Sequence, residues 1–191
     1  TFLLSRVAEE ITMGVEPQAV AFVSFTRAAA SEARARAASA LPWVDPASLS
    51  LWSTIHSLCY RMLGLRRDQV FTGKRLVEFA TKWGYRLSVN IDRDAQDLPD
   101  QALFSTEDYY EHFIGWWAHT MEPDFPTAFR SYLRQATDLP TDFGLPGLQQ
   151  YIERREAFKQ ERGLVDFEDM LRLVLARGLT PEIDVLLADE V

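Results

Sequence analysis

Three short groups of polar residues each follow an apolar stretch, and they hold the side chains that could bind nucleic acid, phosphate or metal. The first group, Phe25-Thr26-Arg27, combines a ring that can stack on a base, a hydroxyl for a phosphate and a guanidinium. It separates an apolar, β-branched run at residues 20–25 from an alanine-rich helical segment at residues 28–38. In open α/β sheets, ligands bind where strands end, and the next helix presents N–H groups to anions. The alternative is that Thr26 only caps the helix.

The second group, Thr54, His56 and Ser57, repeats this arrangement at the end of a strand pattern over residues 49–54. The segment 55–63 has the pattern of a helix, so these polar groups would lie at its start. His56 could contact a phosphate or a base edge, or it could be a partly buried histidine beside a capping Thr54. The three histidines and the one cysteine of the chain lack the spacing of zinc ligands, so we expect no metal cluster.

The third group is the acidic pair Asp189-Glu190, which follows an apolar strand pattern at residues 183–188. Two carboxylates at the end of a buried parallel strand suit a Mg²⁺–nucleotide site. The first would hold the hydrated metal, and the second would orient or deprotonate the attacking water. Acidic pairs at strand ends are also frequent without any such role, and that alternative stays open at this point.

Composition limits the class of protein. The chain has 191 residues, of which 47% are hydrophobic, so a substantial core can form. A net charge of −8 argues against a protein that simply coats nucleic acid, although basic residues gather in the first third. A single cysteine fits a reducing compartment, and we expect a cytoplasmic protein. No apolar run approaches the length that crosses a bilayer, so we expect no membrane partner.

The order of the elements predicts an α/β fold with a parallel sheet that is interrupted by a mostly helical inserted subdomain. Strand, helix, strand and helix follow one another over residues 1–63, which indicates parallel βαβ units. Residues 64–162 read as helices, and at 163–191 a further helix and strand return to the first domain. We expect the helix after Val165 to be capped by Asp166, with Asp169 three residues on.

An aromatic stripe marks the expected helix over residues 106–121. It is favoured as a core packing surface, and a base-stacking platform is the alternative. Its members are Tyr109, Tyr110, Phe113, Trp116 and Trp117.

Together the motifs are more specific than any one of them. The segments FVSFTRAAASEARARA, STIHSLCYRML, GLVDFEDML and IDVLLADEV occur in this order, and the chain resembles the first RecA-like domain of UvrD/Rep-type superfamily 1 DNA helicases. The resemblance implies a RecA-like sheet of the P-loop NTPase type and a protein that uses ATP and Mg²⁺. It also implies that the chain begins just after the phosphate-binding loop, whose lysine would precede Thr1, and ends inside the Asp-Glu-x-Gln-Asp motif.

The resemblance also assigns roles to residues. Asp189 matches the Mg²⁺ ligand and Glu190 the catalytic base. Arg27-Ala28 stands where the family usually has Asn-Lys. The nucleic-acid-binding positions are Phe25, Thr26, Arg27, Thr54, His56 and Ser57.

The function that follows is part of an ATP-dependent DNA helicase that moves on single-stranded DNA and unwinds duplex DNA. Its partners would be single-stranded DNA and single/double-strand junctions. We expect the isolated chain to be inactive as an ATPase, because the phosphate-loop lysine is required for hydrolysis. Two alternatives stay open, a non-enzymatic DNA-binding or protein-docking module and an α/β NTPase that acts on something other than DNA.

Overall fold

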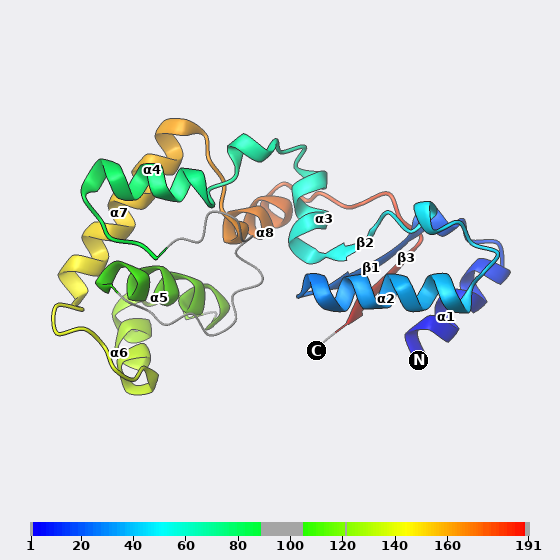
Figure 1. Cartoon of the computed structure of the whole chain (residues 1–191), viewed down its shortest axis with the longest axis horizontal. Coiled ribbons are helices and arrows are strands. Elements are labelled where there is room, and N and C mark those ends of the chain that lie inside the picture. The colour runs from blue at the N-terminus through cyan, green and yellow to red at the C-terminus, as the bar shows by residue number, and fades with distance from the viewer. Residues whose placement is uncertain (1, 89–104, 121, 190–191) are drawn as a thin grey trace. The chain divides into compact units, whose positions relative to one another are not determined.

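The computed structural model describes residues 2–88, 105–120 and 122–189, which pack into two compact units (Figure 1). The sheet unit comprises Thr1–Leu65 with Met170–Val191, and the helical unit comprises Arg66–Asp169. Among the described residues, no helix has the length and apolar character that a membrane crossing requires. The domain boundaries expected at 63/64 and 162/163 stay predictions.

The sheet unit contains three parallel strands in the order β2-β1-β3. They are β1 (Val20–Ser24), β2 (Trp52–Thr54) and β3 (Val185–Asp189). Two chain segments that lie far apart in the sequence therefore pair in one sheet, which confirms the predicted α/β class. β2 is shorter than the expected strand, because a 3-10 turn at Pro46–Ser48 and a further turn occupy the residues before Trp52.

Helices pack against this sheet because their apolar faces need burial. They are α1 (Phe2–Thr12), α2 (Arg27–Ala40) and α3 (Ile55–Met62). The greater part of α8 (Phe167–Ala176) also belongs to the sheet unit. All five residues of β1 are buried, as expected for a central parallel strand. A core forms between the sheet and helices α1 and α2, from Val7, Val20, Phe22, Ala37, Leu41, Val44, Leu49 and Trp52.

The helical unit is built around an aromatic core. Its helices are α4 (Lys74–Trp83), α5 (Thr106–Thr120), α6 (Phe125–Gln135) and α7 (Leu145–Arg162). Tyr110 and Phe113 of the predicted stripe are buried in this core, and the other three aromatic residues of the stripe pack against it. The structure therefore confirms the core interpretation of the stripe.

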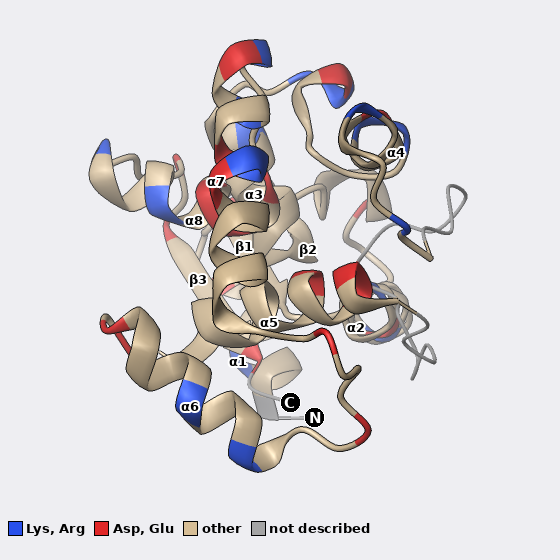
Figure 2. Cartoon of the chain, turned by 90° about the vertical axis from the view of Figure 1, so that its left-hand side faces the viewer, with Lys and Arg blue, Asp and Glu red and all other residues tan. Residues whose placement is uncertain are grey.

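A buried network of charged side chains joins α7 to the start of α8. Figure 2 marks the basic and acidic residues along α7. Arg155 Nη1 lies 2.7 Å from Asp166 Oδ2, and Lys159 Nζ lies 2.6 Å from the same oxygen. Lys159 also reaches Asp169 at 2.7 Å, while Arg155 pairs with Glu111 of α5 at 3.0 Å. The predicted cap is confirmed, since the Asp169 N–H donates to Asp166 Oδ1 at 2.8 Å.

The electrostatics of this network follow from its burial. Burial raises the pKa of Asp166, but attraction to Arg155 and Lys159 outweighs burial and holds that pKa well below its usual range. Burial and Arg155 lower the pKa of Lys159, yet its carboxylate partners raise it overall. Each ion therefore stabilises the charged state of its oppositely charged partners at neutral pH.

Candidate nucleic-acid interface

The carboxyl ends of the three strands form a row in which the candidate residues lie. Ser24 at the end of β1 is in register with Thr54 of β2 on one side and Asp189 of β3 on the other. Because neighbouring strands are about 4.8 Å apart, Thr54 and Asp189 mark the ends of a row roughly 10 Å wide. The residues that follow in the chain, Phe25 and His56, continue from this same edge of the sheet.

Phe25 lies just beyond β1 and projects from the surface. Its exposed fraction is 61%, so Phe25 is not part of the core at the end of the strand. Strand β1 ends at Ser24, one residue earlier than expected, which leaves Phe25 outside the ladder. Ser24 itself is buried, and its Oγ accepts from the Thr26 N–H at 3.4 Å. This contact helps to define the turn that directs Phe25 outward.

Thr26 is the N-cap of α2. Its Oγ1 accepts a hydrogen bond from the Ala29 N–H at 3.1 Å, and its backbone is extended, with φ −114° and ψ 149°. The capping bond uses the Thr26 hydroxyl only as an acceptor, so the hydroxyl proton can still be donated to another group. Arg27 begins the helix and is exposed. The positive end of the helix dipole and the Thr26 hydroxyl therefore meet at one exposed position.

Thr54 plays the corresponding part for α3, with a different exposure. Its Oγ1 accepts from the Ser57 N–H at 3.2 Å and lies 2.9 Å from Ser57 Oγ. Thr54 is only 2% exposed, whereas His56 and Ser57 are half-buried. The structure thus confirms the capping interpretation of Thr54. His56 and Ser57 are the partly exposed side chains of this group, although the His56 Nε2 atom itself is buried.

Asp189 ends β3 and is half-buried, and Glu190 lies outside the described residues. Among the residues that the structure describes, no group of three or more His, Cys, Asp and Glu side chains could enclose a metal ion. A single aspartate is nevertheless compatible with Mg²⁺, which keeps several waters and binds through one or two carboxylates and the phosphates of a nucleotide. Asp189 can therefore serve as a ligand of that kind.

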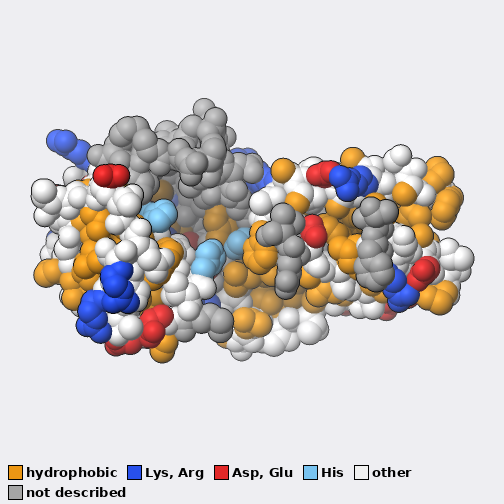
Figure 3. Space-filling view, turned by 90° about the horizontal axis from the view of Figure 1, so that it is seen from below, with side chains coloured by type: hydrophobic (Ala, Val, Ile, Leu, Met, Phe, Trp, Pro, Cys, Tyr) orange, Lys and Arg blue, Asp and Glu red, His pale blue; other side chains and the backbone are white. Residues whose placement is uncertain are grey.

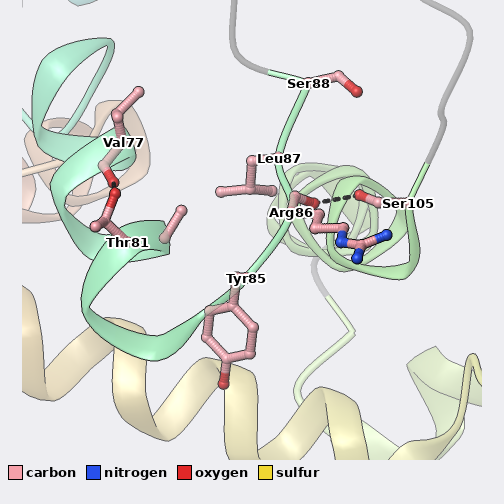
Figure 4. A pocket seen from close by; sticks show the side chains of 8 residues that line it. Val77, Thr81, Tyr85, Arg86, Leu87, Ser88 and Ser105 are labelled. Atoms are coloured by element: carbon pink, nitrogen blue, oxygen red, sulfur yellow. Dashed lines mark hydrogen bonds between the residues drawn. The ribbon is translucent and has the colours of Figure 1, made fainter.

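A cavity of about 450 Å³ lies in the helical unit and includes none of the candidate residues (Figure 4). Two hydrogen bonds join residues that line it (Figure 4): Ser105 Oγ donates to the Arg86 carbonyl, and Thr81 Oγ1 donates to the Val77 carbonyl. None of the described residues that line it carries a carboxylate. The lining residues are Val77, Ala80, Thr81, Tyr85, Arg86, Leu87, Ser88 and Ser105.

Exposure alone does not single out Phe25. The space-filling view shows apolar side chains scattered among polar ones over the surface (Figure 3). Such single residues are normal on a protein surface. What distinguishes Phe25 is its position at the strand-end row, beside a helix N-terminus. The large apolar side chains of the sheet unit that are exposed to a similar degree are Met13, Trp43, Leu175 and Leu186.

Two arginines of α2 have different partners. The Arg34 Nη2 donates to the backbone carbonyl of Trp52, and Arg36 pairs with Glu32 on its own helix. A helical arginine looks alike in sequence whether it meets solvent or a strand, because only the packing of the helix on the sheet decides between them.

The sequence model of the UvrD/REP helicase N-terminal domain matches residues 1–189. The chain belongs to the UvrD/REP helicase family. No curated protein and no solved structure matched the chain. Membership of the family implies an origin in an ATP-dependent DNA helicase, with ATP use and DNA binding in general. The parallel sheet and the helical unit are consistent with the RecA-like N-terminal domain of this UvrD-like family.

Proposed function

We propose that this chain supplies the DNA-facing strand ends of an ATP-dependent helicase that moves on single-stranded DNA and unwinds duplexes at single/double-strand junctions. The observation that carries the proposal is the register of Ser24 with Thr54 and Asp189. It brings an exposed ring, two capped helix starts and a carboxylate to one edge of a parallel sheet. Ligands of α/β proteins bind at such edges.

On the DNA side, Phe25 stacks on a base, and Thr26 donates its hydroxyl proton to a phosphate near the start of α2. Arg27 adds a positive charge at this position. His56 and Ser57 form the second contact, and the buried Thr54 positions them through its bonds to Ser57. The contacts to phosphate and ring faces carry no base-edge code, so we expect binding with little dependence on sequence.

On the nucleotide side, Asp189 would hold Mg²⁺ and Glu190 would orient the attacking water and accept its proton. A bound magnesium ion supplies charge neutralisation at the phosphates of ATP. Asp189 of β3 is in register with Ser24 of β1, and Phe25 is the residue after Ser24. The strand that carries the nucleotide-site residue Asp189 is therefore only one strand spacing, about 4.8 Å, from the strand that leads into the DNA-facing turn. A shift of Asp189 on nucleotide binding would act directly on this neighbouring strand.

The test compares two exposed aromatic residues of the sheet unit in the full-length protein. Phe25→Ala should weaken binding of a fluorescein-labelled single strand by roughly 1–3 kcal/mol, which is about 5- to 150-fold in Kd, for both oligo-dT and a mixed sequence. Trp43 is 66% exposed and stands away from the strand ends in the chain, so Trp43→Ala is the matched control. Fluorescence anisotropy gives the Kd, and thermal melting reports stability.

We expect Trp43→Ala to leave the affinity unchanged and both variants to melt within a few degrees of the wild type, as for most surface substitutions. Equal affinity of Phe25→Ala and the wild type would refute the stacking role. An equal loss in both variants would show that the measured effect is not specific to the strand-end row.

A further inference from the structure

Two arginines from different helices hold the backbone of the segment that leads into β2. Arg34 of α2 donates from Nη2 to the carbonyl of Trp52. Arg61 of α3 donates from Nη1 to the carbonyl of Ser50 at 2.6 Å. Hydrogen bonds from a charged donor are stronger than neutral ones. The segment 50–52 is thereby fixed from both sides just before the strand end that carries Thr54.

These two hydrogen bonds matter because β2 has few backbone hydrogen bonds that hold it in place. It is three residues long and pairs with β1 at one edge of the described sheet. The two residues before it, Ser50 and Leu51, lie in a turn rather than in the ladder. A short edge strand has few ladder bonds to hold its register, so contacts from neighbouring helices decide where it ends.

We propose that Arg34 is a positioning residue that sets the second DNA-contacting group in place relative to the first, with Arg61 as its second support. Arg34 belongs to α2, which Thr26 caps, and the helix packs directly on β2. The carbonyl that it holds is two residues before Thr54, which in turn holds Ser57. The proposal rests on the proposed DNA contacts of Thr26, His56 and Ser57, and it states how their spacing is maintained.

Arg36 provides a matched control on the same helix. It is exposed and pairs with Glu32, and two residues along a helix turn the side chain by about 200°. Arg34→Gln and Arg36→Gln remove the same charge from neighbouring positions. Arg34→Lys keeps the charge while it replaces the planar fork by a single flexible ammonium group. The three variants therefore separate charge from geometry.

The first measurement needs no DNA. Hydrogen exchange of the full-length protein should be about fivefold faster in peptides that cover residues 52–57 for Arg34→Gln and Arg34→Lys, which corresponds to a local opening that is about 1 kcal/mol easier. Exchange in β3 should not change, nor should any peptide respond to Arg36→Gln. Unchanged exchange at residues 52–57 in both Arg34 variants would overturn the proposal.

The second measurement is the affinity for a single strand as a function of salt. Arg34→Gln should weaken binding about fivefold at every salt concentration, with the slope of log K against log salt unchanged. The loss should not add to that of His56→Ala, because both act on the same strand end. A slope that becomes shallower by about 0.7, together with restored binding in Arg34→Lys, would mean that Arg34 touches a phosphate and would overturn the positioning role.

The outcomes separate this inference from the proposed function. If Phe25→Ala weakens binding while Arg34→Gln changes neither exchange nor affinity, the DNA contacts stand and the positioning role fails. If Phe25→Ala and His56→Ala both bind like the wild type, the proposed contacts fail, and the positioning role fails with them even where exchange responds. A drop in melting temperature alone, without a change in affinity, reduces Arg34 to a structural residue and also overturns the proposal.

Discussion

Replacing Lys159 by methionine tests how strongly the buried charge network stabilises the helical unit. Lys159 Nζ lies 2.6 Å from Asp166 Oδ2 and 2.7 Å from Asp169 Oδ2, and its side chain is only 4% exposed. Methionine keeps much of the volume but removes the charge, which leaves two carboxylates next to each other with less compensation. Breaking a buried ion pair on one side costs about 3–5 kcal/mol. Since Arg155 still contacts Asp166, we expect the lower end, about 3 kcal/mol.

The matched control is Lys82→Met. Lys82 Nζ lies 2.8 Å from Glu161 Oε2, so the pair has nearly the same length, but its lysine side chain is 40% exposed. Exposed pairs contribute about 0–1 kcal/mol, and the cation–π contact of Lys82 with the Phe158 ring, at 5.6 Å, adds little at an exposed position. The two variants therefore compare burial at almost constant geometry.

Urea unfolding followed by far-UV circular dichroism gives the free energy of unfolding, and hydrogen exchange in α7 shows which unit has lost protection. We expect Lys159→Met to lose about 3 kcal/mol and Lys82→Met about 1 kcal/mol or less. Equal losses would refute the reasoning, because burial would then not decide the strength of the pair. A stabilised Lys159→Met would mean that desolvation of the ions outweighs their attraction.

Further predictions concern pH, caps and the core. The folded pKa of Asp166 lies below its unfolded value of about 3.9, so its contribution to stability is present above that pH and is lost as the pH falls through the folded pKa. In urea titrations at a series of acidic pH values, the free energy of unfolding of Asp166→Asn should therefore fall less steeply with decreasing pH than that of the wild type. Thr26→Ala should lower the free energy of unfolding by about 1 kcal/mol and Thr26→Ser by less, in urea titrations. Phe113→Ala should cost about 3–5 kcal/mol by the same measurement, because the ring is fully buried among aromatic residues. Gly163 ends α7 with φ 61°, so Gly163→Ala should lower the melting temperature by a few degrees, equivalent to about 1 kcal/mol.

Much of the fold could be predicted because its signals are local. The apolar run at β1 and the alanine-rich α2 differ so clearly in period and composition that their junction is visible in the sequence. The pairing of β1 with β3 is not local, but it follows from parallel βαβ order together with the resemblance to a helicase domain. The length of β2 was overestimated, since Leu49 is as apolar and buried as a strand residue while its backbone belongs to a turn.

The charge network shows what the sequence could not reveal. Arg155 and Lys159 stand four residues apart on α7 among three glutamates, which is the pattern of a solvated helix face. Their burial depends on Asp166, which approaches from the next segment of the chain, and on Glu111 of α5. A hydrophobic pattern depends only on the residues of one helix or strand, so it cannot show that a charged residue is neutralised by a residue of another element. Only Asp166 gave a local signal, as the expected cap of α8.

The two threonine caps show that helix capping and ligand binding by a threonine hydroxyl do not exclude each other. Thr26 and Thr54 each stand between a strand and a helix, and each accepts a hydrogen bond from the N–H three residues on. Thr26 is exposed, however, whereas Thr54 is 2% exposed. A threonine hydroxyl accepts from the helix and keeps its own proton to donate, so an exposed cap can do both tasks and a buried cap only the first. The difference arises from what packs over each strand end, and for this reason we propose phosphate contact for Thr26 and positioning for Thr54.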